Sequence, residues 1–168
     1  MKKIIFLDID GVLNSKFWYS KMDDDTPKDK WGYAFDPVSV ANLKRIVDET
    51  GAGIVISSSW RCFGLPVLRK MWEARKLPGR IIDATPDSMC DKDMLAMDID
   101  FDLIDPGAIR GYEIREWLSR HGKNVSHYAI LDDMYEMLLE QQSHLVMTDS
   151  EIGISDADAD RIIGILNS

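Results

Sequence analysis

The chain has 168 residues, of which 45% are hydrophobic and 29% charged, and a formal net charge of −9. This length and composition predict one compact domain over residues 1–168 with a sizeable core. The negative charge argues against an extended nucleic-acid-binding surface, which needs basic side chains, but it allows an enzyme that binds a nucleic-acid end in a local basic pocket.

The first predicted strand, residues 4–9, ends at two carboxylates and a glycine. Asp8 and Asp10 are two residues apart, so on a strand their side chains point the same way. Gly11 allows the backbone to turn sharply directly after them. Two like charges at this spacing are unfavourable unless a cation or a shared proton offsets them. The pattern therefore indicates a site for a hard metal ion and a phosphate.

A helix and a second strand are predicted next. Asp36 caps the helix, Pro37 lies in its first turn, and Gly51 ends it. Residues 53–57 form an apolar run that is typical of a strand covered on both faces. This strand ends in the triplet of residues 57–59, which are all serines.

The remaining elements continue the alternation of helix and strand. Helices are predicted from Pro66, over residues 113–120 and 134–142, and after a Ser155 cap; strands are predicted over residues 80–84, 127–131 and 145–148. Residues 15–35 and 85–109 show no clear periodicity, and they are interpreted as a flap and a loop insertion. The fold class expected is α/β, a three-layer Rossmann-like fold with a mainly parallel five-stranded sheet and a minimal cap domain or none.

Polar side chains are expected to meet at the carboxyl ends of these strands, where open parallel sheets bind ligands. Asp132 and Asp133 follow the fourth strand as Asp8 and Asp10 follow the first. Carboxylate oxygens suit Mg²⁺, which prefers oxygen ligands and keeps room for a substrate phosphate.

The serines at the end of the second strand can hold phosphate oxygens, but a cation is still needed to offset the phosphate charge. Arg110, at the entry to the helix that precedes the fourth strand, is the best-placed candidate. Lys123 and Arg61 are alternatives that can reach the same place.

The motifs DIDGVLN, VISSSWR, an RG pair at the head of a helix, and ILDD resemble, in this order, those of the haloacid dehalogenase (HAD) superfamily of phosphatases. The segments SSSWR, RGYEIREWL, ILDD and VMTDSEIGIS are similar to segments of the HAD domains of Swiss Army Knife RNA repair proteins. The resemblance extends from residue 4 to about residue 166.

The resemblance implies a Mg²⁺-dependent phosphomonoester hydrolase with an aspartyl-phosphate intermediate. Asp8 would be the nucleophile, and Asp10 would protonate the leaving oxygen and then activate water. The metal ligands implied are the carboxylate of Asp8, the backbone carbonyl of Asp10, and the pair formed by Asp132 and Asp133.

The same resemblance assigns the phosphate-binding residues. Ser57 would bind the transferring phosphoryl group, with Ser58 as its competitor for that role. Arg110 would stabilise the charge on the phosphoryl oxygens, a position where the superfamily more often has lysine.

The substrate and several plainer interpretations stay open. The substrate could be a nucleotide, an RNA or DNA end phosphate, or a small phosphorylated metabolite, and a non-catalytic phosphate- or protein-binding module is the alternative to an enzyme. Each motif also has a structural explanation, because aspartates and serines at strand ends commonly cap turns.

A second DxD pattern, Asp98 and Asp100, lacks a preceding strand and is interpreted as an acidic loop. Six aromatic residues could stack on a base or pack the flap onto the core: Phe17, Trp18, Tyr19, Trp31, Tyr33 and Phe35.

No targeting or membrane segment is expected. The apolar run of residues 4–7 is shorter than the roughly 7–15 residues of a signal-peptide core. No stretch approaches the roughly 20 apolar residues of a membrane span. Cys62 and Cys90 lack metal-ligand spacing, so we expect reduced thiols and a cytoplasmic protein without membrane partners. The oligomeric state is not predicted.

Overall fold

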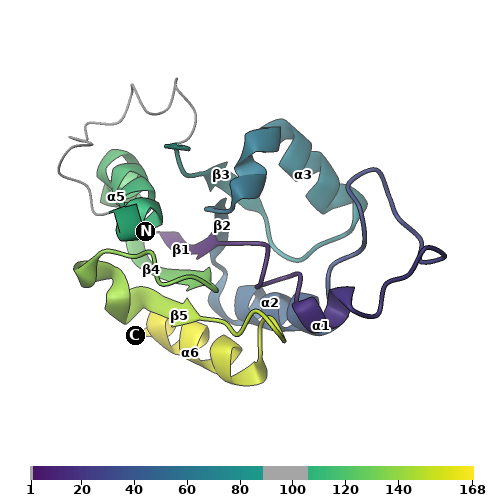
Figure 1. Ribbon diagram of the computed structural model, residues 1–168. Helices are drawn as coiled ribbons and strands as arrows, with labels where there is room; N and C mark the ends of the chain where they lie inside the picture. The colour runs from purple at the N-terminus through teal and green to yellow at the C-terminus, as the bar shows by residue number, and fades with distance from the viewer. Residues whose placement is uncertain (1, 89–105) are drawn as a thin grey trace.

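The computed structural model describes residues 2–88 and 106–168. Five parallel strands form one sheet in the order β3-β2-β1-β4-β5 (Figure 1). The strands are β1 (Lys2–Leu7), β2 (Gly53–Ile56), β3 (Ile81–Ala84), β4 (Val125–Asp132) and β5 (Leu145–Met147). The predicted α/β class and parallel sheet are thus confirmed.

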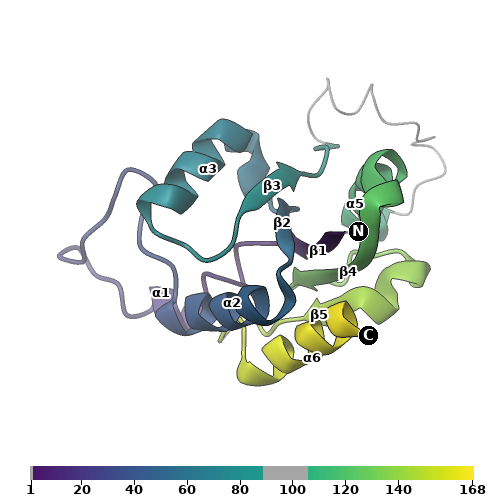
Figure 2. The same ribbon diagram turned by 180° about the vertical axis from the view of Figure 1, so that it is seen from behind.

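Helices cover both faces of this sheet (Figures 1 and 2). The α-helices are α1 (Lys16–Tyr19), α2 (Pro37–Thr50), α3 (Leu65–Ala74), α5 (Ile109–His121) and α6 (Asp156–Asn167). Short 3₁₀ helices are η1 (Ser59–Phe63), η3 (Pro106–Ala108), η4 (Gly122–Asn124) and η5 (Leu139–His144). In both views α2 and α6 lie together on one side of the sheet and α5 lies on the other.

The strand β1 shows why the central strands are apolar throughout. Ile5 and Leu7 belong to the core cluster shared with α2, α3 and α6, whereas Ile4 and Phe6 belong to the cluster shared with α5. Successive side chains of a strand point to opposite faces, and both faces are covered here. Phe6 meets Trp117 of α5 edge to face, with ring centroids 5.3 Å apart.

The predicted helix caps are confirmed. Asp36 accepts a hydrogen bond from the Val38 amide at 2.9 Å, and Gly51 ends α2 in the left-handed conformation. At the start of α6, Ser155 and Asp158 form the predicted capping box.

The prediction of a helix over residues 134–142 is wrong. The segment is irregular up to Leu138 and continues as η5. Some of its polar groups bond to α5: the Gly111 amide donates to the Glu136 carbonyl at 2.9 Å, and the Gln141 side chain donates to the Gly111 carbonyl at 2.9 Å. These tertiary hydrogen bonds outweigh the local helical pattern.

The predicted flap and the predicted loop insertion are described by the structure to different extents. Residues 15–35 contain α1 and a loop that Arg75 holds through two hydrogen bonds of 2.8 Å to Asp29. Of the loop insertion over residues 85–109, residues 89–105 lie outside the described part of the chain, and with them Cys90, Asp98 and Asp100.

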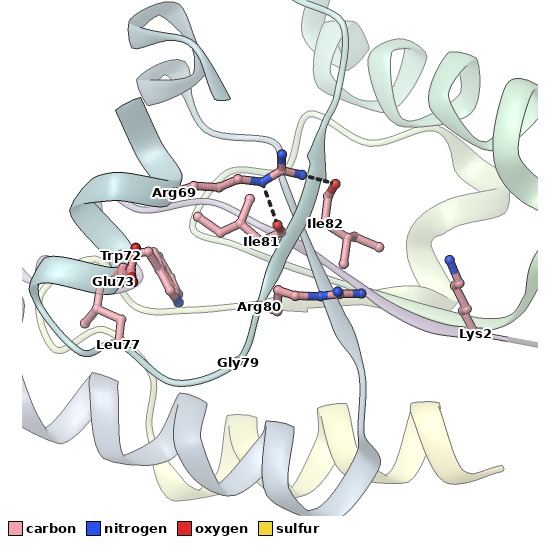
Figure 3. A pocket seen from close by; sticks show the side chains of 9 residues that line it. All are labelled: Lys2, Arg69, Trp72, Glu73, Leu77, Gly79, Arg80, Ile81 and Ile82. Carbon is pink, nitrogen blue, oxygen red and sulfur yellow. Dashed lines mark hydrogen bonds between the residues drawn. The ribbon is translucent and has the colours of Figure 1, made fainter. Parts of the chain in front are cut away.

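A cavity of about 660 Å³ lies at the β3 edge of the sheet (Figure 3). Arg69 from α3 donates hydrogen bonds to the carbonyls of Ile81 and Ile82, at 3.0 and 2.5 Å, and so covers part of the exposed edge strand. The cavity includes Lys2 and Arg80, which lie at the amino ends of the strands, opposite the predicted site.

Among the helices of the described residues, none has the length and apolarity that crossing a bilayer requires.

Candidate active site

Strand register brings the predicted residues together at the carboxyl edge of the sheet. Leu7 pairs with Leu131 of β4 and with Ile56 of β2, so the residues that follow these strands are neighbours. The Asp8 amide donates to the Leu131 carbonyl at 3.0 Å, and the Ser57 amide donates to the Leu7 carbonyl at 3.0 Å. Asp8 therefore lies between β4, which ends at Asp132, and Ser57.

Three carboxylates form the acidic centre of the site. Asp8, Asp132 and Asp133 each place an oxygen so that all three lie within 4.8 Å of one another. Asp8 and Asp132 are buried, and Asp133 is half-buried. Gly11 makes room for this approach: it has a φ of +75°, and a Cβ atom there would overlap the Asp133 carboxylate.

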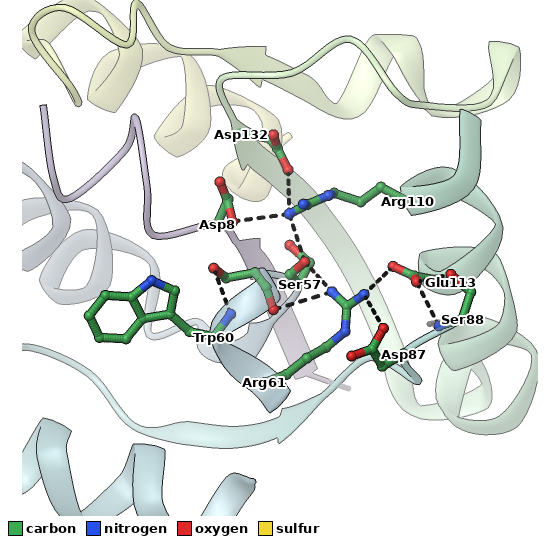
Figure 4. Close-up of polar contacts among 10 residues, drawn as sticks. Asp8, Ser57, Trp60, Arg61, Asp87, Ser88, Arg110, Glu113 and Asp132 are labelled. Carbon is green, nitrogen blue, oxygen red and sulfur yellow. Dashed lines mark hydrogen bonds and ion pairs between the residues drawn. The ribbon is translucent and has the colours of Figure 1, made fainter. Parts of the chain in front are cut away.

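Arg110, from the first turn of α5, is the cation at this centre (Figure 4). Its Nη1 lies 3.0 Å from Oδ1 of Asp8, 3.2 Å from Oδ2 of Asp132 and 2.7 Å from the Ser57 carbonyl oxygen. The helix begins four residues earlier than predicted, and this places Arg110 on it. Gly111 allows α5 to approach closely, because a Cβ atom there would lie 2.6 Å from the Leu138 amide nitrogen.

The charges of these groups are strongly coupled. Burial, together with the nearby Asp8 carboxylate, raises the pKa of Asp132 to about 7 although Arg110 opposes the rise. Burial and the Asp8 charge also raise the pKa of Asp133. Burial alone would lower the pKa of Arg110, but Asp132 and Asp8 outweigh it and raise that pKa above its ordinary value. Three carboxylates against one guanidinium leave a centre that favours a further cation.

The first two of the three serines that follow β2 differ in the surroundings of their hydroxyls. The Ser58 hydroxyl accepts a hydrogen bond from the Trp60 amide at 3.3 Å and caps η1. The Ser57 hydroxyl is buried, and within the described residues it has no hydrogen-bond partner. A buried polar group without a partner is costly, so this hydroxyl is suited to a ligand oxygen. The geometry favours Ser57 over Ser58 as a phosphate contact.

The two alternative cations are placed differently from Arg110. Lys123 lies in η4, at the opposite end of α5 from Arg110. Arg61 is close to the site, but its Nη1 donates to the Ser57 carbonyl at 2.5 Å and its Nη2 pairs with Glu113 at 2.7 Å. Of these three cations, only Arg110 contacts Asp8.

The Arg61–Glu113 ion pair is a buried support that sequence reasoning did not identify. Both side chains are more than nine-tenths buried, and Glu113 also accepts hydrogen bonds from the amide and hydroxyl of Ser88, at 2.9 and 2.7 Å. Figure 4 shows that Arg61 connects the segment at Ser57 with α5, because it contacts both Ser57 and Glu113. The sequence does offer one signal for this pair. Glu113 lies one helical turn after Arg110, so the two side chains leave the same face of the helix, and a carboxylate on a face that is buried needs a partner. The pair fixes Ser57 relative to Arg110.

Asp10 does not join the acidic centre. Its carboxylate is exposed, and it accepts hydrogen bonds from Asn14 Nδ2 at 3.1 Å and from Trp60 Nε1 at 2.8 Å. The partner Trp60 lies within the SSSWR motif, but its contact spans 50 residues and no local pattern predicts it. Asp10 is thus held beside the acidic centre and separate from it.

Asp132 caps a turn at the end of its strand, which is the structural explanation considered above for such aspartates. Its Oδ1 accepts a hydrogen bond from the Met134 amide at 2.9 Å and caps the turn after β4. Its Oδ2 faces Arg110. One aspartate therefore serves both the turn and the acidic centre.

The residues present fit a divalent metal ion with hard oxygen ligands. Asp8, Asp132 and Asp133 offer carboxylate oxygens at suitable separations, and their excess negative charge disfavours the empty arrangement. With a buried hydroxyl and a guanidinium beside them, the same edge of the sheet can hold a phosphoryl group next to the Asp8 carboxylate. The separately held Asp10 is available for proton transfer.

Comparison with known proteins identifies a family for this chain. Residues 4–159 match the family model described as the HAD domain in Swiss Army Knife RNA repair proteins. None of the curated proteins compared with the chain matches it. The match includes every residue of the acidic centre, Ser57 and Arg110.

Proposed function

Because the chain belongs to the family of HAD domains in Swiss Army Knife RNA repair proteins, and HAD domains are generally hydrolases or phosphatases, we propose that it is a Mg²⁺-dependent phosphomonoester hydrolase. The observation that carries the proposal is the position of Asp8. Its carboxylate pairs with Arg110, lies close to Asp132 and Asp133, and follows the strand that is paired with the one preceding the unpartnered Ser57 hydroxyl. A carboxylate so placed faces the groups that a phosphoryl substrate needs.

The reaction would proceed in two steps. A carboxylate oxygen of Asp8 attacks phosphorus as the bond from phosphorus to the leaving oxygen breaks, and Asp10 gives that oxygen a proton. Asp10 then takes a proton from a water molecule, whose oxygen attacks phosphorus and breaks its bond to Asp8. Inorganic phosphate leaves, and both aspartates return to their starting state.

Arg110 and Ser57 would bind the phosphoryl oxygens throughout these steps. Preorganised donors at the position where charge develops are worth most in a buried site. Asp8, Asp132, Asp133 and the Asp10 carbonyl would hold Mg²⁺, which would supply charge neutralisation between the phosphate and the nucleophile.

The substrate is a phosphorylated small molecule or a nucleic-acid end in this proposal. A phosphatase of a small metabolite remains the second candidate, since the charge of −9 disfavours polyanions. We further propose one cytoplasmic domain over residues 1–168, with residues 15–35 as a flap.

The test is phosphate release with Mg²⁺ from a panel of substrates. The panel contains p-nitrophenyl phosphate, nucleoside 3′- and 5′-monophosphates, sugar phosphates, and oligoribonucleotides with a 3′- or 5′-phosphate. We expect release by the native protein and none by Asp8→Asn. Absence of release across the whole panel would favour a non-catalytic binding module.

A further inference from the structure

A cavity of about 520 Å³ lies on the side of η1 that carries aromatic residues, and one of its walls is Trp60, the hydrogen-bond partner of Asp10. It is lined by Lys30, Trp31, Ser59, Trp60, Cys62 and Phe63. Its volume falls in the range of about 300–1,000 Å³ that small-molecule sites occupy. The mechanism described above uses no atom of this cavity except through Trp60.

Trp60 connects this cavity to the reaction. Its indole Nε1 donates to Oδ2 of Asp10 at 2.8 Å, while its ring forms a wall of the cavity. Figure 4 shows the indole pointing away from the guanidinium of Arg61. If Asp10 protonates the leaving oxygen, that oxygen lies beside Asp10. The cavity is therefore one side chain away from the position of the leaving oxygen, within reach of the rest of the leaving group.

The lining suits a planar ring. Trp60 packs edge to face between Phe35 and Phe63, with centroids 5.7 and 5.9 Å away. Phe35 is buried in the core, but Phe63 is 57% exposed, so this aromatic row ends at a ring that is open to solvent. Aromatic faces of this kind bind bases by stacking, with little dependence on sequence.

The rim of the cavity suits the polar edge of a base and the charge of a nucleotide. The Lys30 ammonium lies 4.3 Å from the centroid of the Trp31 ring, so a cation accompanies one aromatic wall. The exposed Ser59 residue adds a hydroxyl group to the lining. In a chain with a net charge of −9, a lysine beside the leaving-group cavity favours an anionic ligand over a neutral apolar one.

We infer that the cavity formed by Trp31, Trp60 and Phe63 binds the nucleobase of the leaving nucleoside, so that the substrate is a nucleoside phosphate. The inference rests on the proposed phosphatase function. The base can come from a free nucleotide or from the terminal residue of an oligonucleotide, and both present the same ring to the cavity.

The test compares substrates that differ only in the base. One pair is adenosine 5′-monophosphate and ribose 5-phosphate; the other is a 3′-phosphorylated oligoribonucleotide with and without its terminal base. We measure kcat/KM for the native protein, for Phe63→Ala and for Phe17→Ala. Phe17 is a matched control because it is 56% exposed and does not line the cavity.

We expect the native protein to prefer the base-bearing member of at least one pair by about tenfold or more, the order of one base–aromatic stack. Phe63→Ala should remove most of this preference, and Phe17→Ala should keep it. The pair that shows the preference identifies the source of the base. Phosphate release without preference in either pair overturns the inference but leaves the phosphatase function intact.

If neither pair is hydrolysed, binding to Asp8→Asn decides the question separately. Indole N–H resonances of Trp31 and Trp60 are followed by NMR during titration with adenosine 5′-monophosphate. Shifts that ribose 5-phosphate does not produce, and that the Phe63→Ala change removes, support the base site even though the proposed reaction has failed. Equal or absent shifts with the two ligands overturn it.

Discussion

The indole Nε1 of Trp60 donates a hydrogen bond of 2.8 Å to Oδ2 of Asp10. The carboxylate proposed as the general acid is therefore fixed by a side chain from η1, 50 residues further along the chain. Asn14 holds the other oxygen at 3.1 Å. The orientation of Asp10 thus depends on two donors outside the acidic centre.

Trp60→Phe keeps an aromatic ring and removes the donor. We expect kcat to fall about 10- to 100-fold for an alkyl phosphate, because a hydrogen bond to a charged group contributes about 1.5–3 kcal/mol. The loss should be smaller for p-nitrophenyl phosphate, whose leaving group needs little protonation. Trp72→Phe is the control, since it removes an indole donor that bonds to the Pro78 carbonyl, away from the site. Equal losses for the two substrates would contradict a role through Asp10.

Arg110 acts through one nitrogen, Nη1, which contacts Asp8, Asp132 and the Ser57 carbonyl. A lysine ammonium can supply a similar point charge, but a neutral side chain cannot. We expect Arg110→Lys to keep kcat/KM within about tenfold, whereas Arg110→Met should lose about 10²–10³-fold, as for removal of one preorganised donor. Steady-state kinetics on one substrate measure both. Equal activity of the two variants would show that the charge is not used.

Gly11→Ala tests the close approach of Gly11 and Asp133. The new Cβ atom would overlap the Asp133 carboxylate, so we expect Mg²⁺ affinity to fall at least tenfold by titration calorimetry. Gly51→Ala is the matched control: its φ is +65°, and nothing lies within 4 Å of its added Cβ. Both variants should lose about 1–2 kcal/mol of folding stability from the left-handed backbone. Unchanged Mg²⁺ affinity in Gly11→Ala would remove Asp133 from the proposed metal site.

The raised pKa of Asp132 predicts a pH-dependent stability of the metal-free protein. A carboxyl group has a pKa of about 3.9 when unfolded, and that of Asp132 is about 7 when folded. Its contribution to stability is therefore full below the unfolded value and is lost as the pH rises through about 7.

Asp132→Asn removes this titration. In metal-free buffer we expect the variant to have a higher Tm than the native protein at pH 8 and a smaller advantage, or none, at pH 5. Adding Mg²⁺ at pH 8 should stabilise the native protein more than the variant. A Tm difference that is the same at both pH values would contradict the raised pKa of Asp132.

Local patterns predicted the parts of the molecule that local chemistry determines. Asp8 and Asp132 follow runs of apolar residues, and parallel strands bring such ends to one edge. Arg110 was identified by its place at the head of a helix. The positions of the two aspartates require only strand order and register.

The remaining features depend on contacts between distant segments. The irregular course after Asp133 follows from hydrogen bonds between Gln141, Glu136 and Gly111, which no helical pattern contains. Trp60 likewise acquires its role only when η1 meets Asp10, and Glu113 only when α5 meets Arg61 of η1. Buried polar partners of this kind are set by tertiary packing.

The most direct test of the central claim is a single-turnover burst experiment with Asp10→Asn and p-nitrophenyl phosphate in Mg²⁺. The good leaving group needs little help from an acid, but hydrolysis of the intermediate still needs the base. We predict a rapid release of about one nitrophenolate per protein followed by a stall, with a phosphoryl group found by mass spectrometry on the peptide that contains Asp8. Steady turnover without a burst, or a phosphoryl group on a different residue, would contradict Asp8 as the nucleophile and Asp10 as the acid and base.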